Sequence, residues 1–307
     1  MARLALLAAV VLAGLASLAG GRIDPYHYDI LVTIGVNIIL AVSLNLVNGH
    51  TGQFSLGHAG FMAVGAYTSA VITLSLRSGP VPVVFPVALV AGGLAAAAAG
   101  FLVGAPSLRL RGDYLAIVTL GFGEIIRVVL QNLEAVGGAR GLEGIPFHTN
   151  LFWSYLGAAL TVFTVGCLVH STYGRGFLAV RDDEIAAEAM GIDTTKYKVL
   201  AFVIGAFFAG VAGGLYGHFK QYINPEGFNF LKSVEVVVMV ILGGMGNTAG
   251  VIVAAIGLTL LNEGLREFEV YRMVVFSLLL ILLMILRPGG LLVCPQWLRH
   301  LWRKRAK

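Results

Sequence analysis

Ten runs of apolar residues, separated by short polar connections, constrain the fold of this chain more than any other feature. Apolar residues make up 58% of the chain and charged residues only 12%, whereas an average soluble domain has about 25% charged residues. About 20 apolar residues are enough to cross the hydrocarbon core of a bilayer as a helix. The runs lie near residues 4–20, 29–47, 59–76, 82–104, 114–133, 151–170, 197–219, 234–243, 249–262 and 270–286. We therefore predict an all-α fold, a polytopic transmembrane helical bundle of about ten helices, in a single domain over residues 1–307.

The eighth and ninth runs need a separate argument, because residues 234–261 are almost continuously apolar. As one helix they would be about 42 Å long at about 1.5 Å per residue, and the hydrocarbon core is only about 30 Å thick. A glycine cluster (Gly243, Gly244, Gly246, Gly250) interrupts the segment. We predict two short helices that cross or re-enter, with residues 243–250 irregular.

The positive charges predict the orientation, because cytoplasmic loops are enriched in Lys and Arg. With a cytoplasmic N-terminus and an even number of crossings, most Lys and Arg residues face the cytoplasm. The basic tail over residues 287–307 contributes most to this bias, and we interpret it as a membrane-anchoring collar rather than a nucleic-acid site. The first run follows Arg3 and ends in small residues, which also describes a cleaved signal peptide. We predict that it remains as the first helix.

A polar interruption over residues 171–196 separates the sixth and seventh runs and contains the pattern of a short helix. Asp182 is predicted to cap its N-terminus, and Asp183 and Glu184 place negative charge in the first turn. Gly191 is placed to end the helix in the left-handed conformation. Glu184 and Glu188 lie on one side of this helix, opposite an apolar stripe with helical spacing. The stripe consists of Ile185, Ala186, Ala189 and Met190.

A helix of two turns is not stable alone in water, so it needs a surface to pack against. We interpret this helix as a docking element. The alternative interpretation is a solvated amphipathic turn between two membrane helices.

Four segments carry a resemblance to a known family. The stretch GRGFLAVRDDEIAAEAMGI (174–192) resembles the cytoplasmic coupling loop of ABC-importer permeases, and more closely that of the branched-chain amino acid permease family. TGQFSLGHAGFMAVGAY (51–67), GDYLAIVTLGFGEIIRVVLQN (112–132) and ILGGMGNTAG (241–250) resemble segments of the same family. The resemblance implies a fold in the style of the vitamin B12-type (type II) importer permeases.

The resemblance also implies function and partners. The chain would form the translocation pathway for branched-chain amino acids in a bacterial inner membrane, with both termini cytoplasmic. It would pair with a second, similar permease, two cytoplasmic ATPase subunits and an extracytoplasmic solute-binding protein. It would bind no cofactor itself, because ATP and Mg²⁺ belong to the ATPases. The residues expected to couple to the ATPases are Arg181, Asp182, Asp183, Glu184, Ile185, Ala186, Glu188, Ala189, Met190 and Gly191.

Uncharged polar residues between the second and third runs form a second candidate site, because broken polar backbone is tolerated in a membrane only where it is buried or lines a cavity. Glu124 in the fifth run is a further candidate, since intramembrane charges face the protein interior or water. Its alternative role is an intrahelical ion pair with Arg127, and that of the polar stretch is a neutral loop. The candidate pathway or gating residues are Asn45, Asn48, Gln53, Ser55, His58, Glu124, Gly243, Gly244, Gly246 and Asn247.

The sequence offers little support for an enzyme. The chain has no P-loop and no Gly-x-Ser-x-Gly or His-Glu-x-x-His motif, so we predict a transport subunit and no enzyme. His50 and His58 have no third ligand nearby, and we predict no metal site. Two alternatives stay open. One is a permease of this family for urea or short amides, and the other is an ion-coupled secondary transporter with matched helix breaks.

Overall fold

The computed structural model describes residues 24–76, 79–107 and 113–266, together with four isolated positions, 274, 277, 278 and 281. The predictions for the first run, most of the last run and the basic tail lie outside these residues. Within them the chain is helical, and the one β contact is an isolated antiparallel bridge between Leu142 and Ile223.

The helices follow the predicted apolar runs closely. They are α2 (Pro25–Asn45) with its π-helical extension η2 (Leu46–His50), α3 (His58–Ser75), α4 (Val81–Ser107), α5 (Asp113–Asn132), α6 (Leu151–Val169), α7 (Thr172–Asp182), α8 (Glu184–Ala189), α9 (Thr194–Lys220), α10 (Phe230–Gly243) and α11 (Thr248–Gly264), with short 3₁₀ turns η3 (Glu134–Val136), η4 (Gly138–Arg140) and η5 (Pro225–Phe228). Five helices within the described residues are long and apolar enough to cross a membrane. The predicted all-α polytopic bundle is therefore confirmed.

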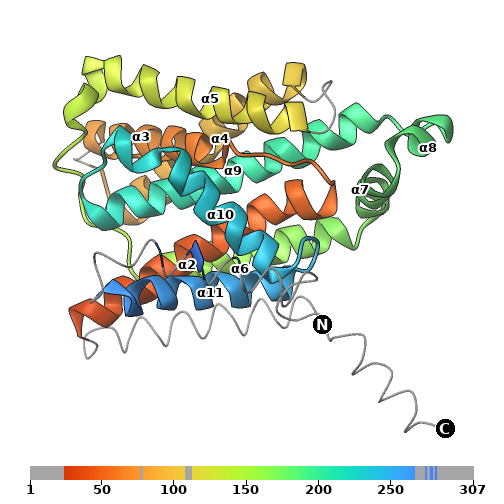
Figure 1. Cartoon of the computed structure of the whole chain (residues 1–307). Helices are drawn as coiled ribbons and strands as arrows, with labels where there is room; N and C mark the ends of the chain where they lie inside the picture. Colours follow the sequence, from red (N-terminus) through yellow and green to blue (C-terminus); the bar gives the residue numbers. More distant parts are fainter. Residues whose placement is uncertain are drawn as a thin grey trace, which may run out of the picture.

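Helices α2 and α9 form the centre of the bundle (Figure 1). α2 packs against α6, α9, α10 and α11, while α9 also packs against α3 and α4. α5 lies outermost, against α3. Most side chains of α4, α5 and α6 are half-buried or exposed in this single chain, so these helices present faces for lipid or for partner proteins.

Glycine allows the helix backbones of α3 and α9 to touch. A Cβ added to Gly65 would overlap the backbone of Gly210, and a Cβ added to Gly210 would lie 2.8 Å from the carbonyl oxygen of Gly92 in α4. Small residues at such crossings are the usual basis of close helix packing in membranes. The glycine-rich composition of this chain, 40 of 307 residues, is thus partly explained by the three-helix contact of α3, α4 and α9.

The predicted break in residues 234–261 is confirmed. α10 ends at Gly243 and α11 begins at Thr248. Gly244 and Gly246 have φ angles of 92° and 83°, a left-handed conformation that glycine adopts without steric cost. The irregular part is shorter than the predicted 243–250, because Asn247 caps α11 by accepting a hydrogen bond from Gly250 N at 3.2 Å.

Candidate functional site

The polar interruption over residues 171–196 folds into two helices, α7 and α8, rather than one. The prediction that Asp182 caps the short helix is wrong by one residue. Asp182 is the last residue of α7 and accepts hydrogen bonds from Arg181, at 2.9 Å from Nη2. Asp183 is the cap, and its Oδ1 accepts from the backbone N–H of Ile185 at 2.9 Å and of Ala186 at 3.0 Å. Extended backbone at Asp183 separates the two helices.

The four residues of the predicted apolar stripe all lie on the exposed side of α8. Ile185 and Met190 are 67% and 82% exposed, and Ala186 and Ala189 are exposed beside them. Gly191 ends the helix with a φ of 82°, as predicted, and Ile192 N donates to the carbonyl of Ala187 at 3.0 Å.

The opposite side of α8 is fixed to the rest of the chain. Ala187 is buried. Glu184 forms an ion pair with the buried Lys198 near the start of α9, and Glu188 accepts a hydrogen bond from Thr194 Oγ1 at 2.8 Å. The helix is therefore anchored to α9 on one side while its apolar stripe faces outward.

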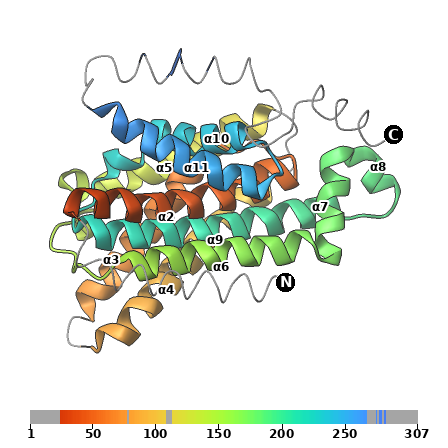
Figure 2. The ribbon, with the colours of Figure 1, turned by 90° about the horizontal axis from the view of Figure 1, so that it is seen from below.

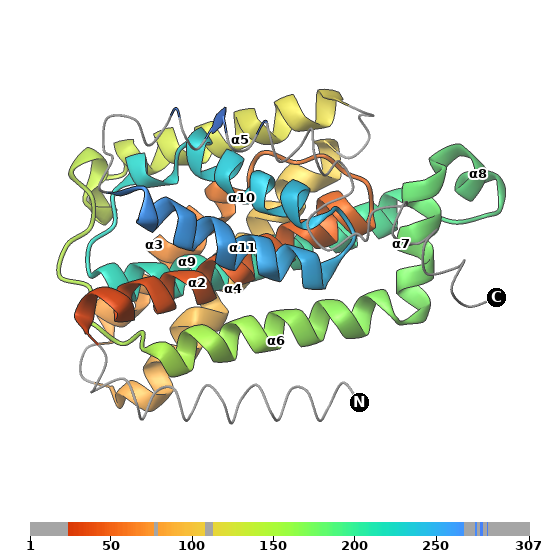
Figure 3. The same cartoon turned by 60° about the horizontal axis from the view of Figure 1, so that its bottom comes forward.

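Helices α7 and α8 project beyond one end of the bundle (Figures 1 and 2). The loop between α10 and α11 lies at the same end (Figure 3). The exposed stripe on α8 is therefore well separated from the apolar flanks of α4, α5 and α6.

At this end of the bundle two helix breaks, far apart in the sequence, meet in a structure that we call the junction: η2 with residues 51–57, and the α10–α11 loop over residues 244–247. Asn45 Oδ1 accepts a hydrogen bond from Gly246 N at 2.9 Å. A Cβ added to Gly49 would overlap the backbone of Gly246. The structure thus brings together both predicted groups of pathway or gating residues, Glu124 excepted.

The first of these breaks is a buried segment with unsatisfied polar groups. α2 passes into the π-helix η2, and the following residues run without regular structure to α3. Such π-helical segments occur frequently at functional sites. Among the described residues, five buried side-chain atoms have no hydrogen-bond partner; four belong to this segment and the fifth to Asn45, the last residue of α2 before it. They are Asn45 Nδ2, Asn48 Nδ2, His50 Nε2, Gln53 Oε1 and Ser55 Oγ.

Unpaired buried polar groups are rare and each is costly, so their concentration here indicates that the segment has a role beyond packing. His58 differs from its neighbours: its Nε2 shares a hydrogen bond of 2.9 Å with Ser43 Oγ, which joins the start of α3 to α2.

Arg181 connects the projecting helices to the junction. Its Nη1 donates to the carbonyl oxygen of Gly49 at 3.5 Å. The same side chain packs along Gly52 and Gly246, since a Cβ added to either glycine would lie 3.0 Å from Arg181 Cγ or 3.3 Å from Nη1, respectively. Sequence reasoning placed Arg181 in the coupling segment, and the structure places it between that segment and both breaks.

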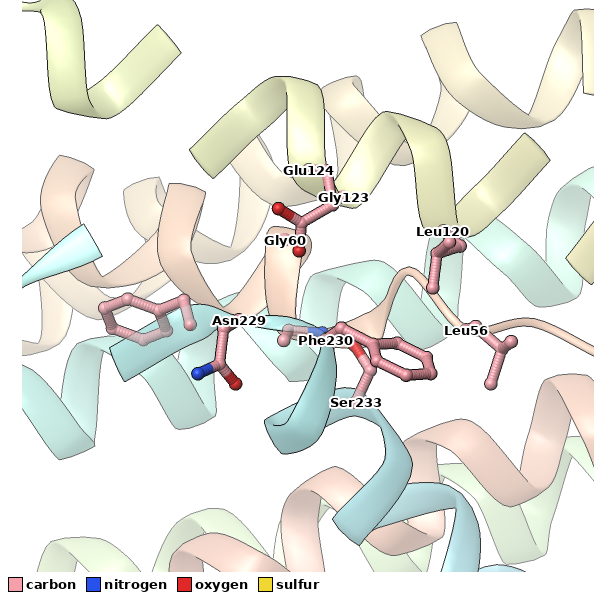
Figure 4. Close-up of a pocket in the computed structure, with 10 residues that line it drawn as sticks. Leu56, Gly60, Leu120, Gly123, Glu124, Asn229, Phe230 and Ser233 are labelled. Carbon is pink, nitrogen blue, oxygen red and sulfur yellow. Dashed lines mark hydrogen bonds between the residues drawn. The ribbon is translucent and has the colours of Figure 1, made fainter. Parts of the chain in front are cut away.

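Glu124 lies on a small cavity between α3, α5 and α10, which borders the junction at Leu56 (Figure 4). The cavity is small, about 10 Å³, which is room for about one water molecule, and its walls include Leu56, Leu120, Phe230 and Ser233. Glu124 Oε2 accepts from Arg127 Nε at 2.7 Å, so the predicted intrahelical pair is present. Sequence reasoning missed the other cavity residues, because they come from three separate segments with no common motif.

A metal centre finds no support in the described part of the chain, where no cluster of three His, Cys, Asp or Glu residues is placed to hold an ion.

Comparison with known proteins gives consistent matches over most of the chain. A family model described as the permease component of branched-chain amino acid transport systems matches residues 26–286. The permease protein LivM of the high-affinity branched-chain amino acid transport system of Escherichia coli K12 is 40% identical over 299 residues, covering 86% of this chain and 69% of LivM.

More distant relatives match too. LivH of the same Escherichia coli system is 26% identical over 294 residues, covering 86% of this chain and 94% of LivH. A probable LivM of Methanocaldococcus jannaschii is 26% identical over 264 residues, covering 72% of this chain and 76% of that protein. No solved structure matches the chain.

Proposed function

The chain belongs to the family of permease components of branched-chain amino acid transport systems, and on this premise we propose that it is the permease subunit of an ATP-driven importer of branched-chain amino acids. Its partners are a second, similar permease, two cytoplasmic ATPase subunits and an extracytoplasmic solute-binding protein. ATP and Mg²⁺ bind to the ATPases, and this chain carries no catalytic residue. The relatives named for branched-chain amino acid transport, LivM and LivH, support the substrate class.

The observation that carries the proposal is the exposed apolar stripe on α8. Isoleucine and methionine at 67% and 82% exposure gain burial only when another surface covers them, which is worth about 1.5–3 kcal/mol for a fully buried side chain. The small Ala186 and Ala189 allow close approach of that surface. A groove on each ATPase subunit is the partner that fits a stripe projecting from the cytoplasmic end of a permease.

The contacts of Arg181 support a route from the ATPase to the membrane. Displacement of α8 moves α7, because Asp183 alone separates them. α7 carries Arg181, which contacts Gly49 and Gly246 in the junction. ATP-driven movement of the docked loop would therefore shift the two broken helix ends relative to each other and open or close the pathway on the cytoplasmic side.

This mechanism requires α8 to face the cytoplasm. A single cysteine at Glu188, in a chain with Cys167 and Cys294 replaced by serine, is expected to resist an impermeant thiol reagent in intact cells and to react after the membrane is opened. Labelling from outside would reverse the proposed orientation.

Replacing Ile185 by Asp tests the docking directly. The variant loses apolar contact and places a charge in the interface, so docking is expected to weaken by several kcal/mol, on the order of the usual desolvation cost. The permease still inserts, because α8 projects beyond the bundle. The expected result is a membrane-inserted permease that no longer retains its ATPases and no longer supports uptake of leucine.

A matched control is Ala187→Ser, a small change on the buried side of α8 that leaves the stripe intact and is expected to retain the ATPases. Full ATPase retention and full uptake in Ile185→Asp would show that α8 is only a surface turn.

A further inference from the structure

The irregular segment that follows η2 turns its polar side chains toward the protein interior. Thr51, Gln53 and Ser55 are buried, whereas Gly52 and Phe54 between them are exposed, Phe54 by 37%. The burial alternates as in an extended chain, in which successive side chains point to opposite sides. The usual arrangement, with apolar side chains inside and polar ones outside, is therefore reversed in this segment.

Elsewhere in the described part of the chain, buried polar side chains have partners. Asn37 Nδ2 donates to Thr259 Oγ1 at 2.9 Å, and Ser154 Oγ donates to the carbonyl oxygen of Val32 at 2.9 Å. Among the residues that the structure describes, the buried side-chain atoms without a partner belong only to Asn45 and the segment after it. The unpaired atoms are thus a local property of the junction and not a general feature of the core.

The side chains that carry these atoms are enclosed by the chain itself. They are between 0% and 5% exposed. A partner protein or a lipid that covers the outer surface does not reach them in this conformation. Solutes and bulk water reach them only if the segment moves, so the unpaired atoms gain partners from outside only in a different conformation of the junction.

The chemistry of the segment is polar and neutral. Residues 45–57 contain no Lys, Arg, Asp or Glu. The amide nitrogens of Asn45 and Asn48 are donors, Gln53 Oε1 is an acceptor, and Ser55 Oγ is both. Such groups bond to the carboxylate and to the ammonium of an amino acid without the strong attraction of a fixed charge. Passage through a membrane protein requires contacts favourable enough for entry and weak enough for release, which neutral donors and acceptors provide.

Contacts at the junction hold the segment in its buried position. Asn45 Oδ1 accepts from Gly246 N at 2.9 Å, and Asn48 Oδ1 accepts from Ser55 N at 3.2 Å. Arg181 Nη1 donates to the carbonyl oxygen of Gly49 at 3.5 Å. Two of these three contacts come from elements outside the segment, α7 and the α10–α11 loop. Movement of either element therefore acts directly on the buried polar side chains.

We propose that Asn45, Asn48, His50, Gln53 and Ser55 line the translocation pathway when it is open, and that the pathway is closed at the junction in this structure. On opening, their unpaired atoms gain hydrogen bonds to water and to the passing amino acid. The cost of unpaired polar groups is then confined to the closed conformation, which makes opening easier once α8 is displaced. The identity of the passing solute rests on the proposed function.

The first test measures exposure of the segment during transport. Single cysteines at Ser55 and Asn48, with Cys167 and Cys294 replaced by serine, are placed in the complete importer in nanodiscs, where both faces of the membrane are accessible. With ATP, Mg²⁺ and the leucine-loaded binding protein, each cysteine is expected to react with a hydrophilic thiol reagent about tenfold faster than without ATP, as for a tenfold rise in the open fraction.

The matched control for labelling is Ser69→Cys. Ser69 is as fully buried as Ser55, but it lies in the contact of α3 with α4 and α9, and its hydroxyl donates to the carbonyl oxygen of Ala66 at 3.0 Å. This cysteine is expected to stay unreactive with and without ATP.

The second test separates the closed conformation from the open one. Ser55→Ala removes a buried hydroxyl that has no partner, so the melting temperature of the purified permease is expected to rise by about 2 °C. Leucine uptake by the complete importer is expected to fall about two- to tenfold, as for loss of one hydrogen bond in the open pathway. Ser69→Ala is the control and is expected to raise no melting temperature and to keep uptake unchanged.

Cysteines at positions 55 and 48 that stay unreactive in both nucleotide states would show that the segment remains buried, with its polar atoms paired by trapped water. Equally fast labelling with and without ATP would show that the junction is not closed. A lower melting temperature for Ser55→Ala would show that the hydroxyl stabilises the closed chain. Each of these results overturns the proposed lining. Absence of leucine uptake by the unmodified importer would instead overturn the proposed function.

Discussion

Asn45 Oδ1 accepts a hydrogen bond of 2.9 Å from the backbone N–H of Gly246, 201 residues later in the chain. This bond ties the end of α2 to the loop between α10 and α11. Both segments depart from α-helical geometry at the point where they meet. A joint between two irregular segments is easier to displace than a contact between two regular helices, because fewer backbone hydrogen bonds hold each side in place.

Removing this bond is expected to destabilise the junction. Asn45→Ala leaves the partly buried N–H of Gly246 without an acceptor, at a cost of about 1–3 kcal/mol. Thermal unfolding of the purified permease in detergent should show a lower melting temperature. Asn132→Ala is the control, since exposed Asn132 donates to the carbonyl of Val128 in its own helix. Equal melting temperatures for the two variants would contradict a stabilising role for Asn45.

A side chain at position 65 is expected to disrupt the contact of α3 with α9. A Cβ there overlaps the backbone of Gly210, so Gly65→Val forces the helices apart and should abolish a folded, monodisperse protein in size-exclusion chromatography. Gly166→Ala in α6 meets no atom within 4 Å and is expected to be neutral or to stabilise by about 1 kcal/mol, the gain in helix propensity. A well-folded Gly65→Val would mean that the two helices can separate without loss of the fold.

The extent of each helix follows from the sequence because hydropathy and glycine are local signals. The runs at 59–76 and 151–170 match α3 and α6 closely, and the glycine cluster correctly divides α10 from α11. The capping residue was placed one position early, because Asp182 and Asp183 are chemically equivalent as caps. The capping residue depends on where the preceding helix α7 ends. Because α7 is amphipathic and lacks a long apolar run, the sequence does not predict that end.

The spatial arrangement does not follow from local pattern. Nothing near Asn45 indicates that its side chain meets Gly246, and nothing near Arg181 indicates that it reaches Gly49. Such contacts depend on how α2, α9 and α10 pack, which is set by the sum of many apolar and glycine contacts rather than by a motif. The cavity at Glu124 escapes sequence analysis for the same reason.

The ion pair between Glu184 and Lys198 is expected to hold α8 in place. The side chains are 25% and 8% exposed, so removal of one partner leaves a charge that is poorly solvated. Glu184→Gln should destabilise the loop more than the double variant Glu184→Gln/Lys198→Met, which removes both charges. Hydrogen exchange of α8 measures the effect, with Glu263→Gln on the exposed pair of α11 as control. If the effect of the double variant equals the sum of the effects of Glu184→Gln and Lys198→Met alone, the pair contributes nothing.

Arg181 is expected to transmit movement without taking part in docking. Its side chain points into the junction, where it contacts Gly49, Gly52 and Gly246, whereas the docking stripe lies on α8. Loss of the arginine should therefore separate two properties that Ile185→Asp removes together, the retention of ATPases and the uptake of substrate.

Arg181→Ala is expected to keep the ATPases bound while leucine uptake falls about tenfold or more, as for loss of a hydrogen bond from a charged donor together with its packing. More ATP should be hydrolysed for each leucine transported. Arg175→Ala is the matched control, because Arg175 is an exposed residue of the same helix and its removal changes the charge of the loop equally. Uptake at the level of the unmodified protein in Arg181→Ala would rule out this arginine as the link. Loss of the ATPases would place its guanidinium in the docking interface rather than in the junction.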